Sequence, residues 1–215
     1  MEFQFLQRFQ TGSDRFDIDL RDLEVLQDDS GSWLYAVNGV NGGISLFRLD
    51  GSAAPPELMQ RYWHEGADLG TGAFALGEIG GEMRLLFEGS SSGDLLSYDI
   101  GGNGALSAQQ TQSLASASAG GLEISVVGGL SAGAHAGDSL VYGITESGVL
   151  QGWRLDGSGT VQAQLATTGG DSAYQLPAAG AGTSGLEILA EAGLLFALDP
   201  LGQGLRSYRI DSESG

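Results

Sequence analysis

The sequence predicts an all-β fold, a β-propeller of four four-stranded blades, because two short strand patterns each recur four times at a spacing of just over fifty residues. The first pattern is an apolar strand with one aromatic residue, and its aromatics are 52, 55 and 54 residues apart. These aromatics are Tyr35, Phe87, Tyr142 and Phe196. The second pattern follows, with aromatics 51, 55 and 55 residues apart. These aromatics are Phe47, Tyr98, Trp153 and Tyr208. Such repeats are typical of propeller blades, and their periodic aromatics indicate packing between blades rather than carbohydrate stacking.

Two further strands complete each unit. A short strand that carries one glutamate comes first, at residues 23–25, 77–79, 122–124 and 186–188. A polar alternating stretch comes last in the first three units, at residues 57–62, 105–110 and 160–165. We therefore expect a single propeller domain over residues 1–215, with blades at about 21–64, 73–113, 121–167 and 184–211, the last one joined by residues 2–10.

The fourth unit ends after its third strand, whereas the chain begins with an alternating stretch at residues 3–9. We expect this N-terminal strand to complete the last blade, which removes an exposed sheet edge. Two other closures stay open. Two chains can form one eight-bladed ring in which each N-terminal strand completes its partner's last blade, or the chain can be the front half of a longer propeller.

Composition excludes several classes of function. The chain carries 27 acidic and 9 basic residues, all of the latter arginine, for a net charge of −18, so nucleic acid and anionic membranes are poor partners. The absence of cysteine excludes disulfides and thiol catalysis. No apolar run approaches the ~18 residues that a membrane span needs, so we expect no membrane insertion. The N-terminus shows no conventional signal peptide. The 37 glycines fit tight turns and converging strands.

The unit at residues 34–51 resembles blades of the lactonase-like and phytase-like bacterial propellers. With its acidic, lysine-free composition, the chain looks most like N-terminal propeller regions of secreted repeats-in-toxin, calcium-binding proteins. This resemblance implies a secreted, extracellular bacterial protein that needs no N-terminal signal. The calcium nonapeptide Gly-Gly-x-Gly-x-Asp of that class is missing: residues 101–105 begin like it, but Leu106 stands in place of the aspartate.

The four repeated glutamates are the candidate metal ligands. They are Glu24, Glu78, Glu123 and Glu187. Fourfold pseudo-symmetry brings them near the central axis, where their repulsion favours a hard cation, and calcium takes 6–8 oxygen ligands. The sequence therefore predicts calcium as a cofactor. The alternative is that backbone amides or repeated arginines satisfy each carboxylate. These arginines are Arg48, Arg154 and Arg209.

Residues outside the repeats are the remaining candidates. Two insertions hold the only histidines, His64 (with Glu65 and Asp68) and His135, and we interpret both insertions as solvated loops. The Gly-x-Ser-x-Gly pattern at residues 89–93 joins two strands, whereas a nucleophile elbow joins a strand to a helix.

We expect a non-catalytic binding or scaffold domain whose partner is a protein or a carbohydrate. One alternative is a calcium-dependent hydrolase of the lactonase or phytase type. Another is a self-assembly module, a homodimer or larger assembly formed by exchange of the N-terminal strand.

Overall fold

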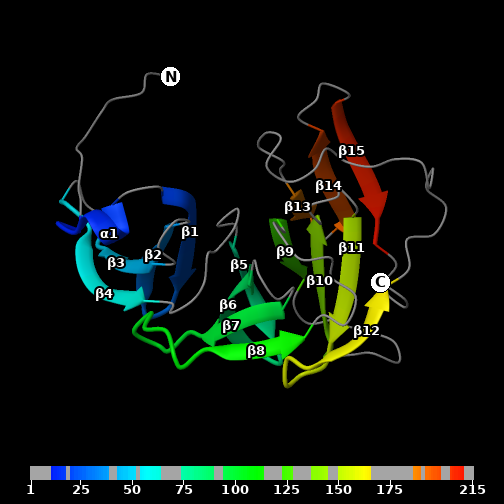
Figure 1. Cartoon of the computed structure of the whole chain (residues 1–215), viewed down its shortest axis with the longest axis horizontal. Coiled ribbons are helices and arrows are strands. Elements are labelled where there is room, and N and C mark those ends of the chain that lie inside the picture. Colours follow the sequence, from blue (N-terminus) through cyan, green and yellow to red (C-terminus); the bar gives the residue numbers. More distant parts are fainter. Residues whose placement is uncertain are drawn as a thin grey trace.

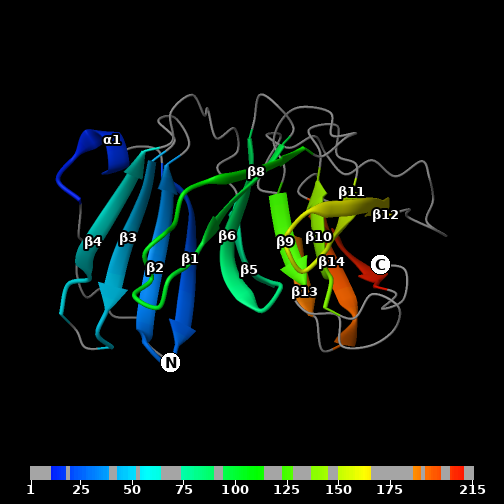
Figure 2. The same ribbon diagram turned by 90° about the horizontal axis from the view of Figure 1, so that it is seen from below.

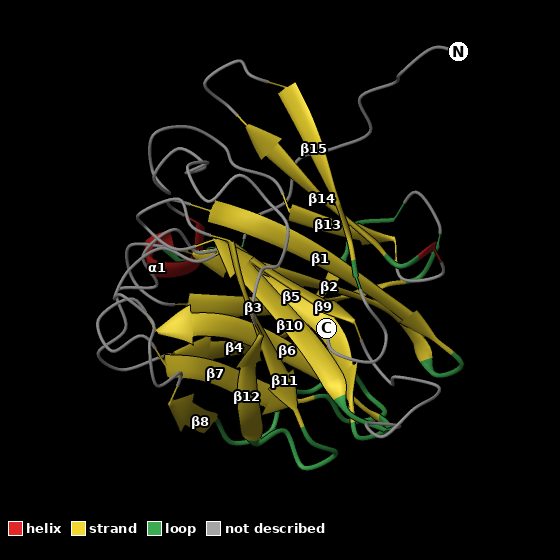
Figure 3. Cartoon of the chain, turned by 90° about the vertical axis from the view of Figure 1, so that its right-hand side faces the viewer, coloured by secondary structure: helices red, strands yellow, loops and turns green. Residues whose placement is uncertain are grey.

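A computed structural model shows an all-β chain, which confirms the predicted fold class (Figure 3). It describes residues 11–17, 20–38, 43–51, 54–63, 74–89, 94–113, 123–127, 137–144, 150–165, 186–189, 192–199 and 204–210. The N-terminal segment 2–10 lies outside these residues, as do both histidine insertions. No helix in the described part of the chain is long and apolar enough to span a membrane.

The described strands form four small antiparallel sheets, one for each sequence repeat. The first sheet holds β1 (Leu20–Asp28), β2 (Gly31–Asn38), β3 (Gly43–Leu49) and β4 (Glu57–Trp63). The second holds β5 (Phe74–Ile79), β6 (Glu82–Gly89), β7 (Asp94–Asp99) and β8 (Gln110–Ser113). The third holds β9 (Glu123–Val127), β10 (Ser139–Ile144), β11 (Leu150–Leu155) and β12 (Val161–Leu165). The fourth holds β13 (Leu186–Leu189), β14 (Leu194–Asp199) and β15 (Gly204–Arg209).

The sheets are arranged in a propeller-like way, with the first strand of each sheet innermost (Figure 1). β1 lies beside β5, β5 beside β9, and β9 beside β13, which is the order seen across the molecule in Figure 2. Each sheet is a meander in which every strand pairs with the next one along the chain. The glutamate-bearing segments thus form the inner strands, as the repeat pattern predicts.

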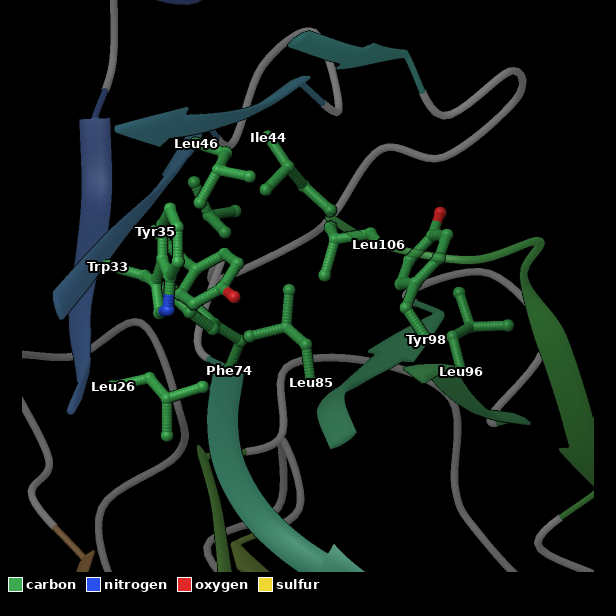
Figure 4. Close-up of a cluster of buried hydrophobic side chains, with 11 residues drawn as sticks. Leu26, Trp33, Tyr35, Ile44, Leu46, Phe74, Leu85, Leu96, Tyr98 and Leu106 are labelled. Carbon is green, nitrogen blue, oxygen red and sulfur yellow. The ribbon is translucent and has the colours of Figure 1, made fainter. Parts of the chain in front are cut away.

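Three apolar clusters fill the spaces between successive sheets, so both faces of an internal sheet are buried. The cluster between the first and second sheets includes Trp33, Tyr35, Phe74 and Leu85 (Figure 4). The next cluster joins the second and third sheets, and a third cluster joins the third and fourth. Among the repeated aromatics, the predicted packing between sheets is confirmed for four: Tyr35, Tyr98, Tyr142 and Trp153. Phe47 is buried as well, but it is not a member of these clusters.

The outer strand of the second sheet starts later than the sequence predicts. Residues 105–110 were expected to be this strand, but β8 begins at Gln110. The preceding segment forms a turn instead: the Gly101 amide donates to the Ala105 carbonyl, and the Asn103 side chain accepts from the Ala105 amide at 3.2 Å. Leu106 is buried in the first cluster, which fixes this turn against the first sheet.

Gly104 lies where this turn packs closely on the Trp33 ring. It has a φ of +75°, and a Cβ there would lie 2.5 Å from Cδ2 of the buried Trp33 ring. Its carbonyl also accepts a 2.8 Å hydrogen bond from the Tyr35 hydroxyl. We expect Gly104→Ala to lower the free energy of unfolding by about 2–4 kcal/mol, because left-handed backbone strain and overpacking add.

Urea denaturation would measure this change. Gly102→Ala is the matched control, since a Cβ at Gly102 meets nothing within 4 Å. The control should stay within about 0.5 kcal/mol of the unchanged protein. Equal stability of the two variants would show that Trp33 does not pack on Gly104.

Candidate functional site

The candidate site is a group of carboxylates at the inner strands, and β1 supplies two of them. Asp22 and Glu24 lie on the same side of β1, since side chains two residues apart share a face of a strand. Leu26 continues this side and is buried against the second sheet. Asp22 and Glu24 are therefore half-buried between β1 and its neighbouring sheet.

Backbone amides hold Asp22 in place. Its Oδ1 accepts a 2.8 Å hydrogen bond from the Leu23 amide, and its Oδ2 accepts one of 3.3 Å from the Phe74 amide on β5. The second bond ties the carboxylate to the neighbouring sheet. Burial raises the pKa of Asp22, while these two hydrogen bonds oppose the rise.

Glu24 has the most unusual titration of the group. Burial raises its pKa to about 7, and the negative charges of Asp22 and Glu187 add to the rise. Glu187 belongs to β13, so the charge of the fourth sheet acts on a carboxyl of the first. Glu187 itself is exposed to solvent. A half-protonated carboxyl beside exposed and hydrogen-bonded carboxylates is the arrangement that general acid–base chemistry uses.

The structure places the four predicted glutamates as follows. Glu24, Glu78, Glu123 and Glu187 all lie on inner strands, namely β1, β5, β9 and β13. Electrostatics couple Glu24 with Glu187, whereas Glu78 is an exposed side chain of β5. The Glu123 side chain lies outside what the structure describes. The described residues include no group of three or more His, Asp or Glu that could hold a metal ion. Calcium at these glutamates stays a prediction.

Two of the repeated arginines pair with other acids. Arg48 forms an ion pair with Glu57, and Arg154 Nε lies 3.5 Å from the Asp138 carboxylate. Asp22 is the member of the site that the repeat pattern misses, because it recurs in no other unit. The period-two alternation of β1 was the signal that could have found it. Residues His64, Glu65, Asp68 and His135, and most of the 89–93 pattern, lie outside the described residues.

Comparison with known proteins finds similarity only among solved structures. No family model and no curated protein matches the chain. A GH43 endo-arabinanase from Bacillus licheniformis is similar, with 18% identity and a TM-score of 0.47, covering 87% of this chain and 72% of that chain. A protein of unknown function from Bacteroides caccae is also similar, with 9% identity and a TM-score of 0.42, covering 86% of this chain and 59% of that chain.

The first of these similarities contradicts one expectation from the sequence. A non-catalytic binding or scaffold domain was expected, whereas the similar structure is that of an enzyme, so we withdraw that expectation. Four equivalent glutamates argue against acid–base chemistry, because that chemistry needs an acid and a base in different environments. The structure removes this objection, since burial and the neighbouring Asp22 set Glu24 apart from the exposed Glu78. The resemblance to lactonase-like and phytase-like blades, and to the repeats-in-toxin class, stays a prediction.

Proposed function

We propose that this chain is a hydrolase that cleaves glycosidic bonds, with Glu24 as the proton donor. The observation that carries the proposal is the pKa of Glu24, about 7, raised by burial and by the charges of Asp22 and Glu187. A carboxyl with this pKa is partly protonated at neutral pH, as the protonation of a leaving-group oxygen requires.

Glycoside hydrolysis suits this set of groups because it needs one protonated and one ionised carboxyl, on either side of the scissile bond. We assign the ionised partner to Glu187, a solvent-exposed residue of β13 whose charge contributes to the raised pKa of Glu24. Asp22 acts through Glu24: its charge keeps the Glu24 proton in place, and its hydrogen bond to the Phe74 amide fixes the inner strands of two sheets relative to each other.

Calcium binding at the four repeated glutamates is our second proposal, and it comes from the sequence repeat. A divalent cation beside Glu24 would favour the ionised carboxylate and so lower its raised pKa. Glu78, Glu123 and Glu187 would be the further ligands. The two proposals differ in the state of Glu24, which is a proton donor in the first and an ionised ligand in the second.

The hydrolase proposal is tested by incubating the protein with a panel of polysaccharides and measuring the reducing ends that are released. The panel should include arabinan, because the similar solved structure is an endo-arabinanase. We expect Glu24→Gln to lower kcat by a factor of about 10² to 10⁴, as loss of a general acid does. In wild type, kcat should fall as pH rises above about 7, where Glu24 loses its proton.

The matched control is Glu82→Gln, which removes an exposed glutamate on β6 that neither proposal uses. Its kcat should equal that of wild type. Wild-type activity in Glu24→Gln would refute the role of Glu24, and a wild-type protein that cleaves no polysaccharide of the panel would refute the substrate class.

A further inference from the structure

The fourth sheet ends on a strand whose outer edge has no partner among the described residues. Among the described residues, the first three sheets contain four strands each and the fourth contains three, so β15 pairs there with β14 on one side only. The outer strands β4, β8 and β12 of the other sheets occupy a position that no described strand fills in the fourth sheet. An edge of this kind presents unpaired N–H and C=O groups to an added strand.

The outward faces of the two end sheets carry exposed apolar side chains. On β1, Leu23 and Val25 point away from the second sheet and are 58% and 57% exposed. On the fourth sheet, Leu189 and Leu205 point away from the third sheet and are 50% and 67% exposed. In the internal sheets both faces are covered by a neighbour, so these two faces match surfaces that a further sheet would bury.

The sequence contains an alternating segment, residues 3–9, with the pattern of a strand that can pair with β15. The described structure begins just after this segment, at Thr11, and shows where Thr11 is held. The Thr11 carbonyl accepts a hydrogen bond from Arg61 on β4, and the Thr11 amide donates to Asp17 Oδ1 at 2.7 Å. Phe16, in α1 (Asp14–Asp17), is buried against Gly43 of β3. Thr11 is thereby held on the first sheet.

Chain connectivity then decides which copy of β15 the segment can reach. If residues 3–9 paired with β15 of their own chain, only Gln10 would link Phe9 to Thr11, a span of at most about 7.6 Å. β4 and β15 lie on opposite sides of the molecule, with the other sheets between them (Figure 1). The same-chain pairing therefore does not reach, whereas a neighbouring copy can bring its β15 to the first sheet.

We propose that two copies of the chain exchange their N-terminal strands. Residues 3–9 of each copy add to the outer edge of β15 in the other, and the first sheet of one copy packs against the fourth sheet of the other. The contact is then the same at both junctions, as a two-fold dimer requires, and it covers Leu23 and Val25 with Leu189 and Leu205. Glu187 shares the outward face of the fourth sheet with Leu189, so this dimer also covers the residue that the hydrolase proposal assigns as the ionised carboxylate. Sedimentation tests the dimer and polysaccharide cleavage tests the hydrolase, so the two proposals can fail separately.

Sedimentation of the full chain gives the first test. The dimer has a mass of about 44 kDa, twice the 22.1 kDa of one chain. We expect deletion of residues 2–9 to halve the sedimenting mass. A monomeric full chain would overturn the proposal.

Cross-linking separates exchange from same-chain pairing and needs no deletion. The chain has no cysteine, so Gln7→Cys and Ser207→Cys together create the only two thiols. A short bismaleimide should join them between chains and give a covalent dimer on a denaturing gel. A linked monomer, or no link, would overturn the exchange. The control pairs Gln7→Cys with Thr111→Cys, an exposed position on β8, and should remain uncoupled.

Discussion

Replacing Trp153 with alanine will lower the free energy of unfolding by about 3–5 kcal/mol, the range for truncating a large buried aromatic side chain. Trp153 lies on β11 and is 1% exposed. It packs with Ile79 and Leu86 of the second sheet, so its side chain fills the space between the second and third sheets. Its removal leaves a cavity at that junction, which the rest of the cluster is too small to fill.

Two further variants make the measurement specific. The indole N–H of Trp153 has no hydrogen-bond partner among the described residues, so Trp153→Phe removes a buried unpaired donor and keeps an aromatic ring. We expect Trp153→Phe to cost less than half as much as Trp153→Ala. Met59 lies on the outer strand β4 and is 43% exposed, so Met59→Ala should change the free energy of unfolding by no more than about 0.5 kcal/mol. A Trp153→Ala loss no larger than the Met59→Ala loss would place Trp153 outside the core.

The recurrence of Trp153 and its counterparts explains why the sheets could be predicted from the sequence. A residue that packs between sheets must be apolar in every copy, so packing leaves a periodic record. Single turns leave none: Asn103 and Gly104 shape the segment before β8 through one side-chain hydrogen bond and one left-handed residue. The helix α1 was missed for the same reason, because Phe16 packs on Gly43 in the first sheet alone.

The candidate site, like the fold, could be predicted from the sequence only in part. The positions of Glu24 and Glu187 on inner strands follow from the repeat, but the difference between Glu24 and Glu78 does not. That difference comes from burial and from Asp22, whose hydrogen bond to the Phe74 amide spans 52 positions of the chain. Such a contact exists only after the sheets have packed. The symmetric sequence pattern therefore predicted four equal carboxylates, whereas the structure distinguishes Glu24 from Glu78.

Replacing Glu24 with glutamine will stabilise the protein above pH 7 although it removes the proposed proton donor. The ordinary pKa of the Glu24 carboxyl, which applies in the unfolded chain, is 4.5, whereas in the folded protein it is about 7. Below pH 4.5 both states hold the proton, so Glu24 adds no pH dependence. Between pH 4.5 and 7 the folded state binds more protons than the unfolded state, so the free energy of unfolding falls as pH rises. Above pH 7 the loss is complete.

The variant lacks this titration, so its stability should exceed that of wild type by about 1–3 kcal/mol at pH 8, with the difference shrinking toward zero at pH 4. Urea denaturation at both pH values measures this difference, and Glu82→Gln on β6 serves as the exposed control that should follow wild type. If the free energy of unfolding depended on pH in the same way for wild type and Glu24→Gln, the raised pKa of Glu24 would be refuted. Adding calcium at pH 8 separates the two proposals. A cation held by these carboxylates would stabilise wild type more than Glu24→Gln. An unchanged unfolding transition of wild type would reject the calcium site and favour the role of the carboxylates in acid–base chemistry.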